Sequence, residues 1–162
     1  MTDEPNRRIS SPTRDRDGVQ VLDIDYYAPF LLSAVSSAWQ RQTSAIYRRD
    51  FNLGIVDWRV IAMINIEPEI TANRICEVIR LDKAAVSRSL KLLEARGLAT
   101  FEASGSDPRR RKWWLTDAGQ AVHRDILAIA LECESRMLDG IDPEDVEIHL
   151  KVMRGMLTNL DR

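Results

Sequence analysis

The stretch from Thr71 to Leu98, "TANRICEVIRLDKAAVSRSLKLLEARGL", constrains the fold of this chain more than any other. Thr71 is suited to cap a short helix that reaches about Ile79. Asp82 is suited to cap a second helix that reaches about Arg96, and the glycine that follows is a good helix stop. Because so short a turn separates them, the two segments predict a helix-turn-helix.

The second of these helices has two contrasting faces. Val86, Leu90 and Leu93 recur at helical spacing and form an apolar stripe. The opposite side has small residues, a hydroxyl and cations, and no acid: Ala84, Ser87, Arg88 and Lys91. Such a face suits insertion into a DNA major groove. The alternative is an ordinary amphipathic surface helix, although glutamate and lysine usually mix on the outer side of those.

A β-hairpin is predicted directly after this helix. The short runs "LATFEA" and "RKWWLT" are separated by "SGSDPRR", which contains glycine and proline. A hairpin in this place is the wing of a winged helix-turn-helix. Its cations, Arg109 to Lys112, can reach a phosphate backbone or a narrow minor groove. We expect one of Trp113 and Trp114 to anchor the hairpin on the helices, with base stacking as the alternative.

Charge is distributed unevenly along the chain. The net charge is −2, but residues 71–115 hold ten Lys/Arg and five Asp/Glu, whereas the remainder holds 13 bases and 20 acids. A basic segment in an acidic molecule favours one surface that faces a polyanion. A solvated charged face is the alternative that charge alone leaves open.

Long amphipathic helices flank the predicted winged domain. Apolar periodicity predicts one helix from Tyr26 to about Asp50 and an apolar one over residues 55–66. Another begins near Asp117, and a final helix begins at Pro143. The fold class is therefore mainly α with a small β-wing.

Four segments follow from this pattern. Residues 1–20 have little to bury and are expected to be a disordered tail. The others are an N-terminal dimerisation helix (21–53), the winged helix-turn-helix (54–116) and C-terminal dimerisation helices (117–162). Because the apolar stripes of the terminal helices have no partner inside one winged domain, we expect a homodimer through residues 26–38, 126–137 and 146–160.

Several classes of protein are not supported by the sequence. Cys76 and Cys133 are far apart, and His123 and His149 are isolated, so neither a disulfide framework, a metal site nor a cofactor is expected. No paired carboxylates or nucleophile with a base indicate an enzyme. The charged N-terminus is unlike a secretory signal, and no apolar run is long enough for a membrane span. We expect a cytoplasmic, nucleoid-associated protein.

The sequence resembles the MarR family of bacterial transcription regulators over about residues 26–160. The similarity is carried by "SDPRRRKWWLTDAG", "LDKAAVSRSLKLLEARGL" and "DWRVIAMI". It implies a dimer whose first, fifth and sixth helices interleave, with two winged domains in successive major grooves of double-stranded DNA at a pseudo-palindrome. It also implies a small-molecule effector that weakens DNA binding.

The resemblance assigns DNA contacts to individual residues. Asp107 would orient Arg109 at the wing, with Arg110 beside it. The base-facing positions of the recognition helix would be Ala84, Ser87 and Arg88, with Arg88 suited to guanine. Phosphate contacts would come from Lys83, Lys91 and the helix that Thr71 opens.

The sequence constrains the effector site less than it constrains the DNA contacts. Trp39, Tyr47, Trp58 and Arg59 lie on helices that usually line the family's pocket, and they suit an aromatic carboxylate or its thioester. They equally suit a core and a dimer seam. The two cysteines are expected to be inert rather than peroxide sensors. Overall the sequence predicts a ligand-responsive repressor, with a winged-helix protein-interaction module without DNA binding as the alternative.

Overall fold

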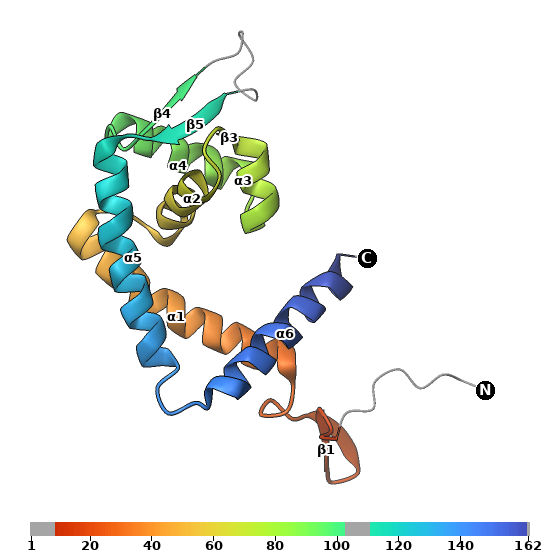
Figure 1. Ribbon diagram of the computed structural model, residues 1–162. Helices are drawn as coiled ribbons and strands as arrows, with labels where there is room; N and C mark the ends of the chain where they lie inside the picture. The colour runs from red at the N-terminus through yellow and green to blue at the C-terminus, as the bar shows by residue number, and fades with distance from the viewer. Residues whose placement is uncertain (1–8, 103–110, 162) are drawn as a thin grey trace. The chain divides into compact units, whose positions relative to one another are not determined.

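The computed structural model describes residues 9–102 and 111–161 (Figure 1). The chain divides into two compact units, residues 1–55 and 56–162, and each is described by itself. Within the described ranges, no helix combines the length and apolar character needed to cross a membrane. The chain is mainly helical with small antiparallel sheets, as the sequence predicts.

The first unit opens with a β-hairpin. Strand β1 (Thr13–Arg16) pairs antiparallel with β2 (Val19–Leu22) through a two-residue turn, Asp17-Gly18. Both turn residues have positive φ, 55° and 79°, which matches the twist of a tight hairpin. The expectation of a disordered tail is therefore wrong from Thr13 onward. The Asp-Gly pair before "VQVL" was the local sequence signal for the hairpin. Residues 1–8 lie outside the described part.

Helix α1 (Ala28–Phe51) follows the hairpin, two residues later than the sequence start at Tyr26. Proline stands in its first turn, and Asn52 ends it with φ of 52°. Only Thr43 and Tyr47 are buried in the helix. Most apolar side chains of its first half are exposed, which leaves that half without a partner in the described chain: Phe30, Leu31 and Val35.

The core of the second unit forms around α2 (Ile55–Ile66), which has the predicted bounds and is apolar on most sides. Its buried residues are Val60, Ile61, Met63 and Ile64. The predicted helix-turn-helix follows as α3 (Ala72–Ile79) and α4 (Lys83–Ala95). The sequence analysis placed both to within a residue.

The wing has three strands. Strand β4 (Ala99–Glu102) pairs antiparallel with β5 (Lys112–Leu115), as predicted. The sequence analysis missed β3 (Ile70–Thr71), which pairs with the other edge of β5 and gives the order β3-β5-β4. Two residues are too few to show a strand period, so only the register with β5 reveals this strand.

Helices α5 (Asp117–Met137) and α6 (Pro143–Leu160) complete the chain and begin at the predicted caps. The Thr116 hydroxyl accepts a hydrogen bond from the Gly119 amide at 3.1 Å and donates one to the Gly97 carbonyl at 2.6 Å. A Cβ at Gly119 would lie 1.9 Å from the Leu98 carbonyl oxygen. Only glycine, which has no Cβ, permits this close approach, and this explains the glycine that follows "LTDA" in the sequence.

Candidate nucleic-acid interface

Side-chain caps fix both helices of the helix-turn-helix. The Thr71 hydroxyl accepts a hydrogen bond from the Arg74 amide at 3.3 Å, and an Asp82 carboxylate oxygen accepts one from the Ala85 amide at 2.9 Å. Arg80 adopts φ of 54° at the end of α3 and turns the chain toward α4. The short connection therefore depends on local chemistry that the sequence already contains.

Helix α4 buries one side and exposes the other. Val86 and Leu93 are fully buried and Leu90 nearly so. The residues predicted to face DNA are all exposed, and Lys83 at the helix start is exposed as well: Ala84, Ser87, Arg88 and Lys91. The side of α4 that faces solvent thus has a hydroxyl and cations over its first three turns. The expected absence of acids does not extend to the last turn, where Glu94 is exposed three residues after Lys91.

The wing is anchored by aromatic packing. Trp113 is buried and Trp114 is half-buried, so Trp113 is the anchor. Its ring lies 4.9 Å from that of Phe101 between centroids, on the paired position of β4. The prediction that one tryptophan anchors the hairpin is confirmed.

Arg111 belongs to this surface, although the sequence analysis assigned it no individual contact. Its guanidinium carbon lies 4.1 Å from the centre of the Phe101 ring, a cation–π geometry. The stack holds the side chain in place before any ligand arrives. The available signal was the strand period, since Arg111 and Trp113 are two residues apart and lie on one face of the hairpin.

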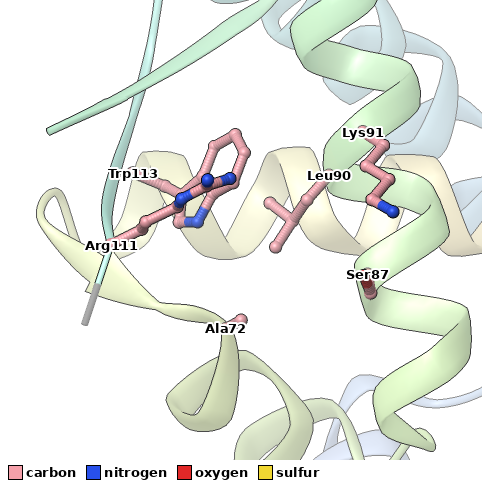
Figure 2. Close-up of a pocket in the computed structure, with 6 residues that line it drawn as sticks. All are labelled: Ala72, Ser87, Leu90, Lys91, Arg111 and Trp113. Carbon is pink, nitrogen blue, oxygen red and sulfur yellow. The ribbon is translucent and has the colours of Figure 1, made fainter. Parts of the chain in front are cut away.

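A hollow of about 380 Å³ lies between the recognition helix and the wing (Figure 2). Ser87, Leu90 and Lys91 line it from α4, while Arg111 and Trp113 line it from the strand side. Ala72, at the start of α3, completes the wall. Two cations and a hydroxyl around an apolar floor suit an anionic group such as a phosphate.

The cations near this surface differ in whether they form an ion pair. Lys112 contacts Glu69 at 2.5 Å, and the carboxylate raises the pKa of the ammonium. Arg74 contacts acids of its own surroundings at 3.4 and 3.6 Å. Lys83, Arg88 and Lys91 form no ion pair with any residue that the structure describes. The outer side of α4 therefore has three cations without an ion-pair partner among the described residues.

Comparisons with known proteins show which family this arrangement resembles. Residues 51–110 match the model of the MarR family. The transcriptional regulator HosA of Escherichia coli O127:H6 is 28% identical over 100 residues, which cover 62% of this chain and 74% of HosA. The MarR-family regulator SPO1453 from Silicibacter pomeroyi DSS-3 has 26% identity and a TM-score of 0.73, covering 86% of this chain and 99% of that one. The chain is therefore similar to transcriptional regulators of the MarR family.

Two solved complexes share the fold of this chain. Staphylococcus aureus MepR, in complex with DNA, has 18% identity and a TM-score of 0.72, covering 84% of this chain and 98% of its own. CouR from Rhodococcus jostii RHA1, bound to p-coumaroyl-CoA, has 19% identity and a TM-score of 0.73, covering 83% and 94%. HosA and SPO1453 are both described as transcriptional regulators.

Three residues with predicted DNA contacts fall outside the described residues, namely Asp107, Arg109 and Arg110. Their roles stay predictions. The described part of the wing reaches only to Glu102 on one strand and resumes at Arg111 on the other.

The predicted effector residues are divided between the two units. Trp39 and Tyr47 lie on α1, with Tyr47 buried. Trp58 and Arg59 lie on α2 and are half-buried. The Trp58 ring is 5.4 Å from that of His123 on α5, where burial lowers the pKa of the imidazole. Whether these residues form one pocket stays a prediction.

The remaining titratable side chains fit a structural role. Burial raises the pKa of the Cys76 thiol, which reduces its thiolate fraction at neutral pH. Cys133 is buried and its sulfur accepts a hydrogen bond from Arg136 at 3.2 Å. Among the described residues, no group of three or more histidine, cysteine or acidic side chains could hold a metal ion.

Proposed function

We propose that this regulator binds a pseudo-palindromic operator as a homodimer, represses transcription there and is released by a small effector. The observation that carries the proposal is the outer side of α4. Over its first three turns it is exposed and carries Lys83, Arg88 and Lys91, which form no ion pair with a described residue, and it stands beside the hollow that Lys91 and Arg111 line. Sequence-specific readout requires donors on a helix that can approach base edges closely.

Each side chain has a distinct proposed role. Arg88 reads guanine through its two-pronged guanidinium, and Ser87 and Ala84 allow the helix to approach. Lys83 and Lys91 contact phosphates, as do the amides at the start of α3. At the wing, Arg109 and Arg110 would contact the backbone or the minor groove. Asp107 would orient Arg109.

The proposed dimer rests on apolar surface that the single chain leaves exposed. Helices α5 and α6 expose large apolar side chains, including Leu131, Leu150 and Leu157. Soluble monomers seldom expose so much contiguous apolar surface. A second copy of the chain would cover it. A regulator of this kind acts on chromosomal DNA, which places it in the cytoplasm at the nucleoid.

For the effector we propose an aromatic acid or its thioester, held by Trp39, Tyr47, Trp58 and Arg59. CouR, which shares the fold, was solved with p-coumaroyl-CoA. Titrating this compound into the DNA complex tests the class directly. Release of DNA at micromolar concentration supports it. Unchanged DNA binding together with unchanged tryptophan fluorescence would rule this class out.

The DNA-binding proposal is tested by gel shift on the region upstream of the regulator's own gene, with a salt series. Arg88→Ala is expected to cost about 1–3 kcal/mol at one base position in each half-site and to relax selectivity there. Arg109→Ala is expected to weaken binding to all sequences and to make the log–log salt slope shallower by about 2 per dimer. Half-sites should lie about 10–10.5 base pairs apart, or a multiple of that.

Two outcomes would contradict the proposal. If Arg88→Ala keeps the parental ratio of operator to random DNA, α4 does not read bases. If the parent protein binds no DNA at low salt, the alternative of a protein-interaction module gains support. Arg124→Ala, on α5, is the matched control, since it removes an exposed cation from outside both the proposed DNA contacts and the ranges proposed for the dimer.

A further inference from the structure

The N-terminal hairpin carries two different faces. In the antiparallel register Arg14 lies opposite Val21 and Arg16 lies opposite Val19, so these four side chains share one face. The other face has Thr13, Asp15, Gln20 and Leu22. Both arginines are exposed, and neither forms an ion pair with a described residue. The first face therefore combines two unpaired cations with two valines.

An isolated two-stranded hairpin is at best marginally stable in water, so this one needs a surface to pack on. Val19 is 58% exposed in the single chain. The solved MarR-family relative SPO1453 is covered over 99% of its length by only 86% of this chain. This chain thus has residues beyond the shared fold.

Helix α6 offers a complementary face. At 100° per residue, Glu144, Ile148 and Val152 stand one turn apart in a row, with Asp145 beside them. Ile148 is 58% exposed and Val152 is 47% exposed. This row lies on the opposite side of α6 from the apolar stripe through Val146, Leu150, Met153 and Leu157. A helix with apolar side chains on two sides needs a packing partner on each of them.

We propose that the hairpin of one chain docks on this second face of α6 in the other chain of the dimer. The two valines of the hairpin would meet Ile148 and Val152, and Arg14 and Arg16 would meet Glu144 and Asp145. Both surfaces pair charges with two branched apolar side chains. The acids of the α6 face stand at its N-terminal end, opposite in sign to the hairpin's arginines, whereas Lys151 lies further along beside Ile148, so the charge complementarity is confined to that end. The inference rests on the dimer in the proposed function.

The occupant is a second copy because of where the hairpin is attached. Only residues 23–27 separate it from α1, whose first turns expose Phe30, Leu31 and Val35. These side chains are covered by the partner in the proposed dimer, so the hairpin is carried to the same partner. A nucleic acid is a poor occupant, since Arg14 to Asp17 carry no net charge.

Two matched variants of the full-length chain test the docking face. Arg14→Gln with Arg16→Gln, and Thr13→Glu with Gln20→Glu, each change the net charge by −2 on opposite faces of the hairpin. The first pair is expected to raise the dimer dissociation constant about tenfold at low salt, and the second by less than about twofold. Sedimentation on dilution measures both, and circular dichroism checks that both variants remain folded.

A charge exchange tests whether the contact is between chains. One variant carries Arg14→Glu with Arg16→Glu, and the other carries Glu144→Lys with Asp145→Lys. Each alone is expected to dimerise weakly, because like charges would meet. When the two are mixed, both hairpins meet an α6 of opposite charge, so native mass spectrometry should show heterodimers well above the statistical share.

The outcomes separate the inference from the proposed function. If the parent is a dimer and the reversals leave its dissociation constant unchanged, the docking is wrong and the dimer stands. If combining all four changes in one chain restores dimerisation but mixing the two variants does not, the hairpin docks on its own chain and the inference between chains is wrong. A parent that stays monomeric at micromolar concentration overturns the dimer itself.

Discussion

Helices α4 and α6 are both amphipathic, but the single chain buries the apolar side of α4 and leaves that of α6 exposed. In α4 the apolar side is buried, with Val86 and Leu93 fully covered, and the helix packs on α3 and on β4 of the wing. Helix α6 has no buried residue, although its leucines recur at the same helical spacing. Among the large apolar side chains of α4 only Leu92 is exposed, whereas those exposed on α6 include Ile148, Leu150, Val152, Leu157 and Leu160.

This difference separates two kinds of outward surface. A helix whose apolar stripe is satisfied within its own chain can leave its polar side for a polar ligand, here DNA. A helix whose apolar stripe is unsatisfied needs another protein surface of similar character. The predictions below test this contrast, from the largest expected effect to the smallest.

Charging the apolar stripe of α6 should have the largest effect. Leu150→Asp with Leu157→Asp is expected to raise the dimer dissociation constant by at least about a hundredfold, because each copy loses two buried leucines. Operator binding should be lost with it. Thr158→Asp, away from the stripe, is the control. Sedimentation and gel shift measure the two effects, and a dimer of parental affinity would show that this stripe is not the interface.

Adding one methyl group where α5 meets the wing should destabilise the fold. Gly119→Ala would place a Cβ 1.9 Å from the Leu98 carbonyl oxygen. We expect a loss of about 1–3 kcal/mol in the free energy of unfolding, because the obstacle is backbone. At Gly155, on α6, an added Cβ meets no atom of its own chain within 4 Å, so Gly155→Ala is the control. Equal thermal midpoints for the two variants would contradict the close approach.

Removing the aromatic face under Arg111 should weaken DNA binding modestly. Phe101→Leu loses the cation–π contact at 4.1 Å and is expected to cost about 0.5–1 kcal/mol of DNA affinity. Phe101→Tyr keeps the ring and should bind like the parent. Fluorescence anisotropy with operator DNA measures both. If Leu and Tyr give the same affinity, the stack does not position Arg111 for DNA.

The cysteines should have no measurable effect. Cys76→Ser and Cys133→Ser are expected to bind DNA like the parent, with and without peroxide, because one thiol has a raised pKa and the other is buried. Gel shift before and after peroxide measures this. If peroxide releases the parent from DNA and either substitution prevents release, a thiol is a sensor.

The sequence by itself determined the features that depend on neighbouring residues. Thr71, Asp82, Thr116 and Asp142 cap the helices that follow them, because a cap needs only a side-chain oxygen and the next few amides. The two faces of α4 follow from the 3.6-residue period in the same way. The hairpin at Asp17-Gly18 had an equally local signal. The prediction of a disordered tail gave more weight to the polar composition around it.

Tertiary structure alone decided the contacts between residues that are distant in sequence. The pairing of β3 with β5, the stack of Arg111 on Phe101 and the contact of Gly119 with Leu98 each join segments whose spacing shows no period. Such contacts depend on the order of strands and on how closely two backbones approach. Those quantities are set when the chain packs, because neither the register of a two-residue strand nor the gap beside a glycine is encoded in the pattern around it.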